Sequence, residues 1–335
     1  MSCKVNLSFY GVFVQFHSDQ EQLVEHIRRD FSFFEFQETR PGLVLNAFFK
    51  EPPYGTLPPM QARYISPRNT CYYHQDLKYI NYSGEALVVH DRKRAVCDIY
   101  SRHHDHLHEI CYMAILSLVT EQLDKRGIHR VHALGLALDG QAILILLDSG
   151  GGKTSLTMEI LSSDNRLKLI SEDSPLIDSA GQILPFPLRL GLHPEDTPSH
   201  VPPRYQRVFK TKEFDPKILI DIDFFSSRIE KSSIQPYIVM IGRRVIGKKG
   251  GIRPVSKFQA FDEFFKNSII GVGLYQGIEY IFQNGAMDIV KKVPLGFSRL
   301  KNTLKVLEKS KSFEFLLGLD KTENSKLLLD FLGAR

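Results

Sequence analysis

The sequence predicts a mixed α/β protein, and three observations support this class. Before residue 102, several short segments alternate apolar with polar residues, which is typical of half-buried strands. After residue 127, apolar segments of strand length alternate with segments of helical spacing, as in an α/β core domain. The 335 residues suffice for two domains of roughly 150 residues each. We therefore expect a small N-terminal α/β module over residues 1–102 and a larger α/β domain over residues 103–335.

The N-terminal module is predicted to contain one helix among short strands. Residues 5–16 alternate as in a strand, and residues 20–31 carry apolar side chains at helical spacing, namely Leu23, Val24, Ile27 and Phe31. Proline, glycine or charged turns separate the remaining predicted strands, which are 43–49, 70–82, 86–90 and 95–101. No motif here indicates a chemistry, so the expected role of the module is recognition of a partner or substrate, or structural support.

A long helix is predicted near the start of the second domain. It spans residues 107–125, and Gly127 is placed to end it. Two apolar strands then flank the pair Asp139-Gly140, which is a strong hairpin signal. The rest of the domain is expected to contain helices at 154–161, 258–265, 298–307 and 320–332, strands at 167–170, 175–178, 183–192, 218–222, 237–242 and 313–317, and a loop at 194–217.

Charge and cysteine usage limit the classes of function. The net charge of +5 is mildly basic, which suits an anionic ligand such as a nucleotide but is too diffuse to indicate nucleic-acid binding. The four cysteines form no CxxC pair and are expected to be reduced thiols of a cytoplasmic protein. No apolar run reaches the roughly 20 residues of a membrane-spanning helix, so no membrane partner is expected. The sequence leaves the oligomeric state open, with a homo-oligomer as one option.

A glycine-rich loop follows the second strand of the predicted hairpin. Gly150, Gly151 and Gly152 allow the backbone to approach a phosphate closely, and the next helix directs its positive N-terminal end at the same place. Lys153 can reach the β- and γ-phosphates of a nucleotide, and the hydroxyl of Thr154 can bind Mg²⁺. The strand before the loop and the helix after it are the context in which such a motif binds nucleotide.

One residue departs from the general phosphate-loop pattern GxxxxGK[ST], which has glycine where this chain has Leu147. A leucine costs about 1–2 kcal/mol if this position requires a positive φ. Two alternatives to a catalytic phosphate loop therefore stay open. One is a structural glycine-rich turn, and the other is a loop that binds nucleotide without chemistry.

Three further polar residues are expected near the loop. His132 opens the strand that pairs with the loop-bearing strand, and Glu172 and Asp173 follow the next strand, where side chains emerge near the same edge. Magnesium prefers hard oxygen ligands and few protein groups, so one carboxylate with Thr154 is sufficient. A second carboxylate can accept the proton of an attacking hydroxyl. Taken singly, His132 also fits a structural strand histidine, and the acidic pair also fits an ordinary turn.

Together these residues resemble the catalytic domain of HPr kinase/phosphorylase, whose fold is similar to the core of phosphoenolpyruvate carboxykinase. The resemblance consists of a histidine 21 residues before the loop lysine, the run D-S-G-x-G-K-[ST] at 148–154, and an acidic pair about twenty residues further on. The family has Asp-Asp where this chain has Glu172-Asp173. The resemblance covers residues 103–193 well and continues weakly to the C-terminus, whereas residues 1–102 do not resemble that family's N-terminal domain. It implies a phosphate-loop kinase core with a mixed sheet, in a divergent member of the family.

By this resemblance, ATP and Mg²⁺ are the expected cofactors. The implied catalytic residues are His132 near the transferred phosphate, Lys153, Glu172 at the general-base position, and Asp173, which would bind the metal together with Thr154. The implied nucleotide-binding set is Asp148, Ser149, Gly150, Gly151, Gly152, Lys153, Thr154 and Ser155.

The implied activity is transfer of the γ-phosphoryl group of ATP to a hydroxyl, with a serine of a peptide or protein as the leading acceptor. Two rival functions remain. The first is a kinase that acts on a small molecule such as an amino acid or a sugar. The second is a nucleotide-binding regulatory module without turnover.

Three other features admit both a structural and a functional interpretation. His104 and His108 have the i, i+4 spacing of a metal-binding pair, but they lie at a helix start, where polar residues are ordinary. The basic stretch 243–253 is either a solvated loop or a flap that contacts an anion. Arg189 follows the acidic pair closely and is the candidate substrate contact, to a phosphate, with an exposed strand residue as the alternative.

Overall fold

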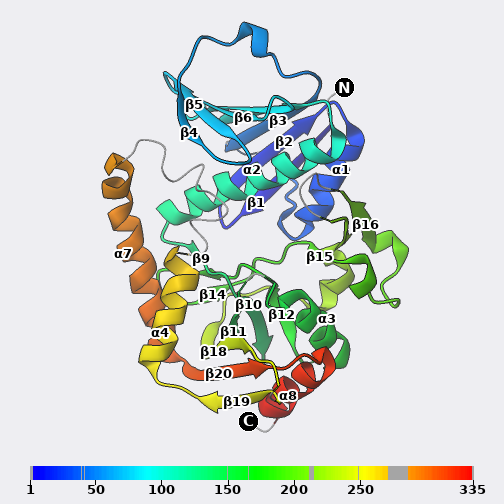
Figure 1. Cartoon of the computed structure of the whole chain (residues 1–335), viewed down its shortest axis with the longest axis vertical. Helices are drawn as coiled ribbons and strands as arrows, with labels where there is room; N and C mark the ends of the chain where they lie inside the picture. The colour runs from blue at the N-terminus through cyan, green and yellow to red at the C-terminus, as the bar shows by residue number, and fades with distance from the viewer. Residues whose placement is uncertain are drawn as a thin grey trace.

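The structure, a computed structural model, confirms the mixed α/β class (Figure 1). It describes residues 3–38, 40, 42–148, 150–164, 166–210, 215–247, 249–270 and 286–333. Within these residues lie an eight-stranded sheet, a six-stranded sheet and two three-stranded sheets. The eight-stranded sheet belongs to the N-terminal part of the chain, and the glycine loop follows a strand of the six-stranded sheet.

The N-terminal sheet consists of β1 (Cys3–Phe9), β2 (Val12–Ser18), β3 (Leu43–Phe49), β4 (Ala62–Ile65), β5 (Thr70–His74), β6 (Leu77–Tyr82), β7 (Ala86–Asp91) and β8 (Val96–Ser101). Their order across the sheet is β1-β2-β3-β8-β7-β6-β5-β4. β2, β3 and β8 run parallel to one another, and the other neighbours are antiparallel. Every second residue of β2 is buried, because successive side chains point to opposite faces and one face bears the core.

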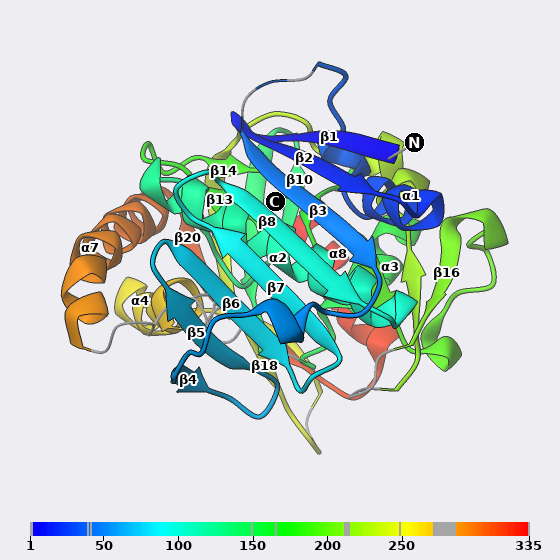
Figure 2. The same ribbon diagram turned by 90° about the horizontal axis from the view of Figure 1, so that it is seen from above.

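Two helices cover one face of this sheet (Figure 2). α1 (Glu21–Asp30) confirms the predicted first helix, and α2 (His104–Lys125) confirms the long one with an earlier start. The apolar residues of both helices pack with those of the strands in one buried cluster. Because α2 packs on the N-terminal sheet, the expected boundary at residue 102 falls inside this cluster. The division into two domains stays a prediction.

Two of the predicted strands are in fact hairpins. Residues 5–16 contain parts of β1 and β2, which are joined at Tyr10 and Gly11 with φ values of 51° and 84°. Such a two-residue turn needs no polar loop, so the alternating pattern runs through it and hides the reversal. Residues 70–82 likewise contain β5 and β6, with Gln75 at a φ of 54°. The edge strand β4 has mostly exposed residues and gives no apolar signal.

The six-stranded sheet consists of β10 (Leu134–Leu138), β11 (Gln141–Leu146), β12 (Lys168–Ser171), β18 (Gln235–Arg244), β19 (Gly251–Pro254) and β20 (Lys311–Leu317). Their order is β12-β10-β11-β18-β20-β19, with β11, β18 and β20 parallel and the other neighbours antiparallel. The hairpin of β10 and β11 turns at Asp139 and Gly140, both at positive φ, which confirms the Asp-Gly prediction. Consecutive residues of β10 and β11 are buried, so their apolar sequence is continuous instead of alternating.

Among the described residues, four helices cover this sheet on both faces: α3 (Lys153–Ser163), α4 (Lys257–Phe265), α7 (Ala286–Lys309) and α8 (Lys321–Gly333). α3 and α8 pack against each other and share a buried cluster with one face of the sheet. α4 and α7 share a second cluster with the opposite face. Each of the four overlaps a helix that the sequence predicts.

Two small sheets lie between the larger ones (Figure 1). One consists of β9 (His129–Arg130), β13 (Leu176–Ile177) and β14 (Ile183–Leu184), and the other of β15 (Leu190–Leu192), β16 (Gln206–Phe209) and β17 (Lys217–Ile220). The predicted loop 194–217 therefore contains β16, which has a single buried residue and so no apolar pattern. Short helical turns are η1 (Ser32–Phe34), η2 (Tyr54–Thr56), η3 (Pro194–Asp196), η4 (Pro203–Tyr205), η5 (Ile222–Arg228) and η6 (Lys266–Ile270).

The cysteines and helices bear on two of the sequence predictions. All four cysteines are thiols that form no disulfide within the described residues, and Cys71, Cys97 and Cys111 are buried. Among the described helices, none has the length and apolar composition that crossing a membrane requires.

Candidate active site

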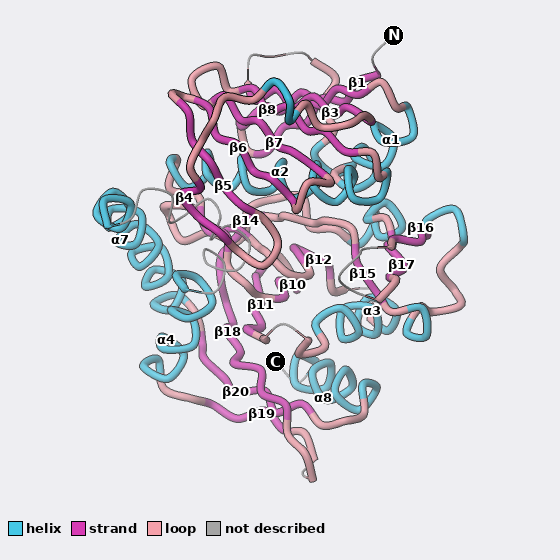
Figure 3. The backbone as a smooth tube through the Cα atoms, turned by 45° about the horizontal axis from the view of Figure 1, so that its top comes forward, coloured by secondary structure: helices cyan, strands magenta, loops and turns pink. Residues whose placement is uncertain are grey.

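The ends of three neighbouring strands lie close together on the same side of the six-stranded sheet, where β11 and β12 end and β10 begins (Figure 3). β11 ends on this side and continues into the glycine loop, while the antiparallel β10 begins there. β12 runs antiparallel to β10 and ends on the same side. His132 lies just before β10, and Glu172 and Asp173 come directly after β12. The strand directions therefore place these three residues beside the loop.

Two glycines of the loop have a left-handed backbone. Gly150 and Gly152 have φ values of 74° and 92°, which residues with a side chain rarely adopt. Gly152 is also the N-cap of α3, and no side chain caps this end of the helix. The N–H groups of residues 153–155 therefore have no acceptor within the helix. Unbonded N–H groups at the positive end of a helix are a ready binding site for phosphate oxygens.

Lys153 is buried beneath the loop, with 6% of its side chain exposed. Its ammonium nitrogen lies 2.9 Å from the carbonyl oxygen of Leu147 and 2.7 Å from Nε2 of His132. It also lies 3.3 Å from Oδ1 of Asp173. The ammonium group thus lies within reach of a carbonyl oxygen and a carboxylate as well as the imidazole, which offsets the cost of burying the charge.

His132 and Asp173 complete a cluster with Lys153. Nε2 of His132 lies 3.0 Å from Oδ1 of Asp173. The main chain holds the two segments together, because the N–H of Ala133 donates to the carbonyl oxygen of Asp173 at 3.2 Å. Nε2 of His132 accepts a hydrogen bond from the ammonium group when the imidazole proton is on Nδ1, and it donates one to Asp173 when the proton is on Nε2. The cluster therefore combines an ammonium group, an imidazole and a carboxylate beside the glycine loop.

Glu172 faces a different partner from its neighbour. The hydroxyl of Thr154 donates to Oε1 of Glu172 at 2.5 Å. This pairing differs from the expectation that Thr154 and Asp173 form the metal site. Two hard oxygen ligands, a hydroxyl and a carboxylate, lie together at the start of α3, and this is the kind of donor set that Mg²⁺ uses beside a phosphate. Within the described residues, no group of three or more His, Cys, Asp or Glu side chains is arranged to hold a metal ion.

The two neighbouring carboxyl groups differ in their pKa values. Burial, followed by the negative charge of Asp173, raises the pKa of Glu172 above its ordinary value. For Asp173, burial opposes ionisation, but the hydrogen bond with His132 and the charge of Lys153 outweigh it and hold the pKa far below its usual range. Asp173 is therefore the carboxylate of the pair, and Glu172 is the acid that takes up a proton more readily.

Leu147 does not strain the loop. It is not among the residues with a positive φ, so the cost considered for a left-handed leucine does not apply. Its side chain is 2% exposed and lies directly over Gly242 of β18. A Cβ on Gly242 would lie 2.3 Å from Cδ2 of Leu147. The leucine therefore anchors the start of the loop in the core.

We expect Gly242→Ala to displace the start of the loop through Leu147. The added methyl group would overlap Leu147 and would also lie 3.1 Å from the carbonyl oxygen of Leu146. Overpacking of this kind typically costs about 1–3 kcal/mol. Urea unfolding should show this loss, and Leu147→Ala should cost less stability in the Gly242→Ala background than in the wild type, because there it also removes the overlapping atoms. An equal cost of Leu147→Ala in the two backgrounds would contradict this packing.

Arg244, outside the predicted site residues, also reaches the loop. It lies at the end of β18, and its Nε donates to the carbonyl oxygen of Gly151 at 3.1 Å. A Cβ on Gly152 would lie 2.4 Å from its guanidinium, so this glycine also allows the close approach. The only signal in the sequence is the basic stretch 243–253 after a strand. One cation of that stretch therefore lies against the loop.

The remaining residues of the predicted nucleotide-binding set belong to the loop itself. Ser149 lies outside the described residues. The carbonyl oxygen of Asp148 accepts a hydrogen bond from the N–H of Gly151 at 2.9 Å, which closes the turn. Ser155 is in the first turn of α3 and is half-buried.

Arg189 is not part of this cluster. Its guanidinium binds Asp30 of α1 at 2.5 Å and stacks 3.8 Å from the ring centre of Tyr112. Only 8% of its side chain is exposed, so the interpretation as an exposed strand residue is wrong. Because its guanidinium is engaged in a buried ion pair, the structure gives no support to a contact with a phosphate of the substrate.

The histidines at the start of α2 also have a structural explanation. Nε2 of His108 lies 2.7 Å from the carboxylate of Asp30, and the residue is buried. His104 packs edge-on against the ring of His26. No set of metal ligands forms around this pair in the described part of the chain.

Comparison with known proteins does not assign the chain to a family. No protein-family model matches the sequence, and no curated protein matches it. The function must therefore be inferred from the loop and the side chains around it.

Proposed function

We propose that the chain is an ATP- and Mg²⁺-dependent kinase of the HPr-kinase-like class, which transfers the γ-phosphoryl group to a hydroxyl. The observation that carries this proposal is the cluster of Lys153, His132 and Asp173 at a glycine loop, followed by a helix whose first N–H groups have no acceptor within the helix. A structural glycine turn would need neither a buried lysine nor a histidine–aspartate pair beside it. Positioning and charge stabilisation are the main requirements of phosphoryl transfer, and these groups supply both.

Each cation of the site has a place in this reaction. The N–H groups of residues 153–155 would bind phosphate oxygens, and Lys153 would exchange some of its present acceptors for the β- and γ-phosphates. Arg244 would add a second positive charge on the other side of the loop. Thr154 and Glu172 would hold Mg²⁺, which neutralises charge that develops on the phosphate oxygens.

Asp173 is the better candidate for the carboxylate that orients the acceptor hydroxyl and takes its proton. Glu172 is engaged by Thr154, whereas 38% of the Asp173 side chain is exposed to an incoming acceptor. This assignment exchanges the roles that the resemblance implies for the two acids. By the resemblance, the acceptor is a serine of a peptide or protein, and a small-molecule hydroxyl remains the alternative.

A nucleotide-binding module without turnover is the second candidate, and one observation favours it. The pKa of Asp173 lies far below its ordinary value, which makes this carboxylate a weak base beside the ammonium group of Lys153. In the kinase proposal, phosphate oxygens neutralise Lys153 when nucleotide binds. The pKa of Asp173 would then rise toward its ordinary value and restore the basicity that the reaction needs.

Lys153→Ala tests the proposal directly. We expect the variant to lose about 10²- to 10³-fold in the rate of ATP turnover, the loss typical for removing one transition-state donor. Turnover would be measured with labelled ATP and Mg²⁺, with water or a serine peptide as acceptor. Lys326→Ala is the matched control, because Lys326 is an exposed lysine on α8.

Two outcomes would contradict the kinase. If ATP and Mg²⁺ together do not raise the melting temperature of the wild-type protein, the loop does not bind nucleotide. If they do, but turnover is no faster than in Lys153→Ala for water or any acceptor, the chain is a nucleotide-binding module.

A further inference from the structure

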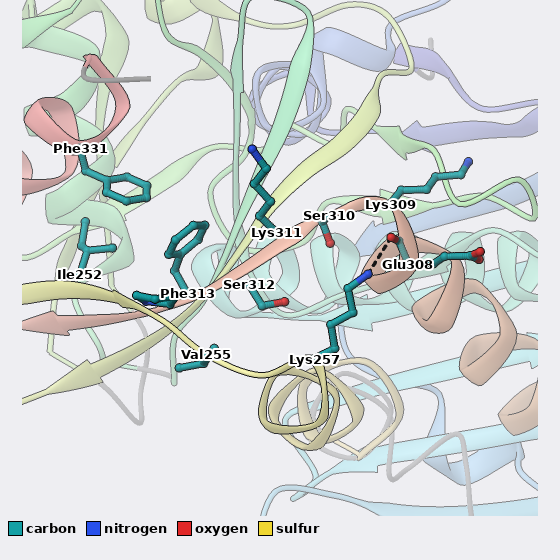
Figure 4. A pocket seen from close by; sticks show the side chains of 11 residues that line it. Ile252, Val255, Lys257, Glu308, Lys309, Ser310, Lys311, Ser312, Phe313 and Phe331 are labelled. Atoms are coloured by element: carbon teal, nitrogen blue, oxygen red, sulfur yellow. Dashed lines mark hydrogen bonds between the residues drawn. The ribbon is translucent and has the colours of Figure 1, made fainter.

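A pocket of about 750 Å³ lies where β20 begins and β19 ends, at the opposite end of the strands from the glycine loop (Figure 4). It is bounded by the start of β20, the connection from β19 to α4, and the end of α7. Lys311, Ser312 and Phe313 contribute from β20, and Lys257 contributes from α4. No residue of the loop cluster lines it.

The register of the sheet separates this pocket from the loop. Phe313 pairs with Met240 of β18, whereas Arg244, which touches the loop, pairs with Leu317. The two positions are four residues apart along the strand, which corresponds to about 13 Å at roughly 3.3 Å per residue. A ligand in the pocket would therefore not occupy the nucleotide position.

The pocket carries an excess of positive charge. Lys257, Lys309 and Lys311 line it together with one acid, Glu308. Among the described residues, none of the three lysines has a carboxylate partner: their contacts are the carbonyl oxygens of Glu308 and Ala180, the amide of Gln235 and the hydroxyl of Tyr237. The three ammonium groups can therefore turn toward an anion without breaking an ion pair.

A buried hydroxyl and a helix end point to the same place. Ser312 is 7% exposed, and its hydroxyl has no hydrogen-bond partner among the described residues. Figure 4 shows this hydroxyl on the side of the pocket where Lys257 lies. α4 begins at the pocket wall, where Ser256 and Gln259 cap each other and leave the N–H groups of Lys257 and Phe258 without acceptors in the helix.

We propose that this pocket binds a phosphate group, either as inorganic phosphate or on a small phosphate monoester, independently of the nucleotide proposed for the loop. The lysines and the N-terminal end of α4 would bind the phosphate, and the hydroxyl of Ser312 would donate to one of its oxygens. The rings of Phe313 and Phe331 also line the pocket, but they lie on the opposite face of the sheet from Ser312 and α4 and are not part of the proposed phosphate site. Because this site shares no residue with the loop cluster, it does not depend on the kinase proposal.

Phenyl phosphate is the probe that tests this site, with inorganic phosphate for comparison. The parent protein carries Lys153→Ala, so that binding at the loop does not interfere, and affinity is measured by isothermal titration calorimetry. We expect saturable binding of both phenyl phosphate and inorganic phosphate. Adding Ser312→Ala, or Lys257→Gln with Lys311→Gln, should weaken it about tenfold or more. Ser312→Ala should keep the melting temperature of the parent, since it breaks no hydrogen bond.

Lys301→Gln with Lys326→Gln is the matched charge control, because both lysines are exposed and neither lines the pocket. This control should bind phenyl phosphate as tightly as the parent. The proposal is overturned if the parent shows no saturable binding, if either pocket variant binds as tightly as the parent, or if the charge control weakens binding equally.

Discussion

Replacing Asp30 by alanine is expected to lower the free energy of unfolding by about 3–5 kcal/mol, as breaking a buried ion pair typically does. Asp30 ends α1 and is fully buried. Its carboxylate accepts hydrogen bonds from Arg189 at 2.5 Å and Arg207 at 2.6 Å, and it lies 2.7 Å from Nε2 of His108. Alanine would leave two buried guanidinium groups with one anion fewer, and urea unfolding would measure the loss.

The same network predicts how this loss depends on pH. Burial opposes ionisation of Asp30, but the charges of Arg189 and Arg207 and the contact with His108 hold its pKa far below the ordinary value. A carboxyl group with a lowered pKa stabilises the fold above its unfolded value, about 3.9, and this contribution is lost as the pH falls through the folded value. The difference in free energy of unfolding between wild type and Asp30→Ala should therefore have its full size near pH 7 and should decrease as the pH falls below about 4.

Two variants control for less specific explanations. Glu25→Ala removes an acid from the same helix, but 50% of the Glu25 side chain is exposed. Its ion pair with Arg28 should therefore contribute only about 0–1 kcal/mol to stability. Asp30→Ala with Arg189→Met should recover part of the stability, because it removes one of the uncompensated charges. A loss for Asp30→Ala no larger than that for Glu25→Ala would mean that the network is not formed.

The sequence predicts the elements whose signal is local, and Asp30 shows where that signal ends. Apolar spacing identifies α1 and α2, and the Asp139-Gly140 pair identifies the hairpin of β10 and β11. Asp30 itself resembles an ordinary polar residue at the end of an amphipathic helix. Its partners Arg189 and Arg207 come from segments about 160 and 180 residues further along the chain, so only the tertiary fold shows that it is buried. The turn at Tyr10 is missed because it does not interrupt the alternating apolar pattern. The strand β16 is missed because its single buried residue creates no such pattern.

Some features of the candidate site can likewise be predicted from local sequence, and others depend on the tertiary fold. The glycines, Lys153 and the spacing to His132 are visible because one hairpin and one helix position them. Which acid faces which partner is not visible, because it depends on the turn after β12, where the N–H of Ser174 donates to the hydroxyl of Ser171 at 3.0 Å. Arg244 arrives from a distant strand, and only the parallel pairing of β11 with β18 brings it to the loop.

The second large expected effect follows from the proposal that Asp173 is the general base and Glu172 a ligand of Mg²⁺. Asp173→Asn should lower the rate of ATP turnover about 10²- to 10⁴-fold, the range typical for loss of a general base. The affinity for ATP should change little, because Asp173 has no hydrogen bond to the described part of the loop backbone and lies beside His132 and Lys153. Glu172→Gln should act differently, by raising the Mg²⁺ concentration needed for half-maximal turnover, since an amide is a weaker ligand than a carboxylate.

Turnover rates at saturating ATP, measured across a Mg²⁺ titration for both variants, separate the two assignments. If Glu172→Gln loses rate that saturating Mg²⁺ does not restore, and Asp173→Asn shifts the Mg²⁺ requirement, then Glu172 is the base, as the resemblance implies. The hydrogen bond from Thr154 to Glu172 argues against that result, because a carboxylate held by the hydroxyl proposed to bind Mg²⁺ would lie on the metal side of the phosphates. Asp173 is the acid that remains open to an incoming hydroxyl while His132 and Lys153 hold it in place.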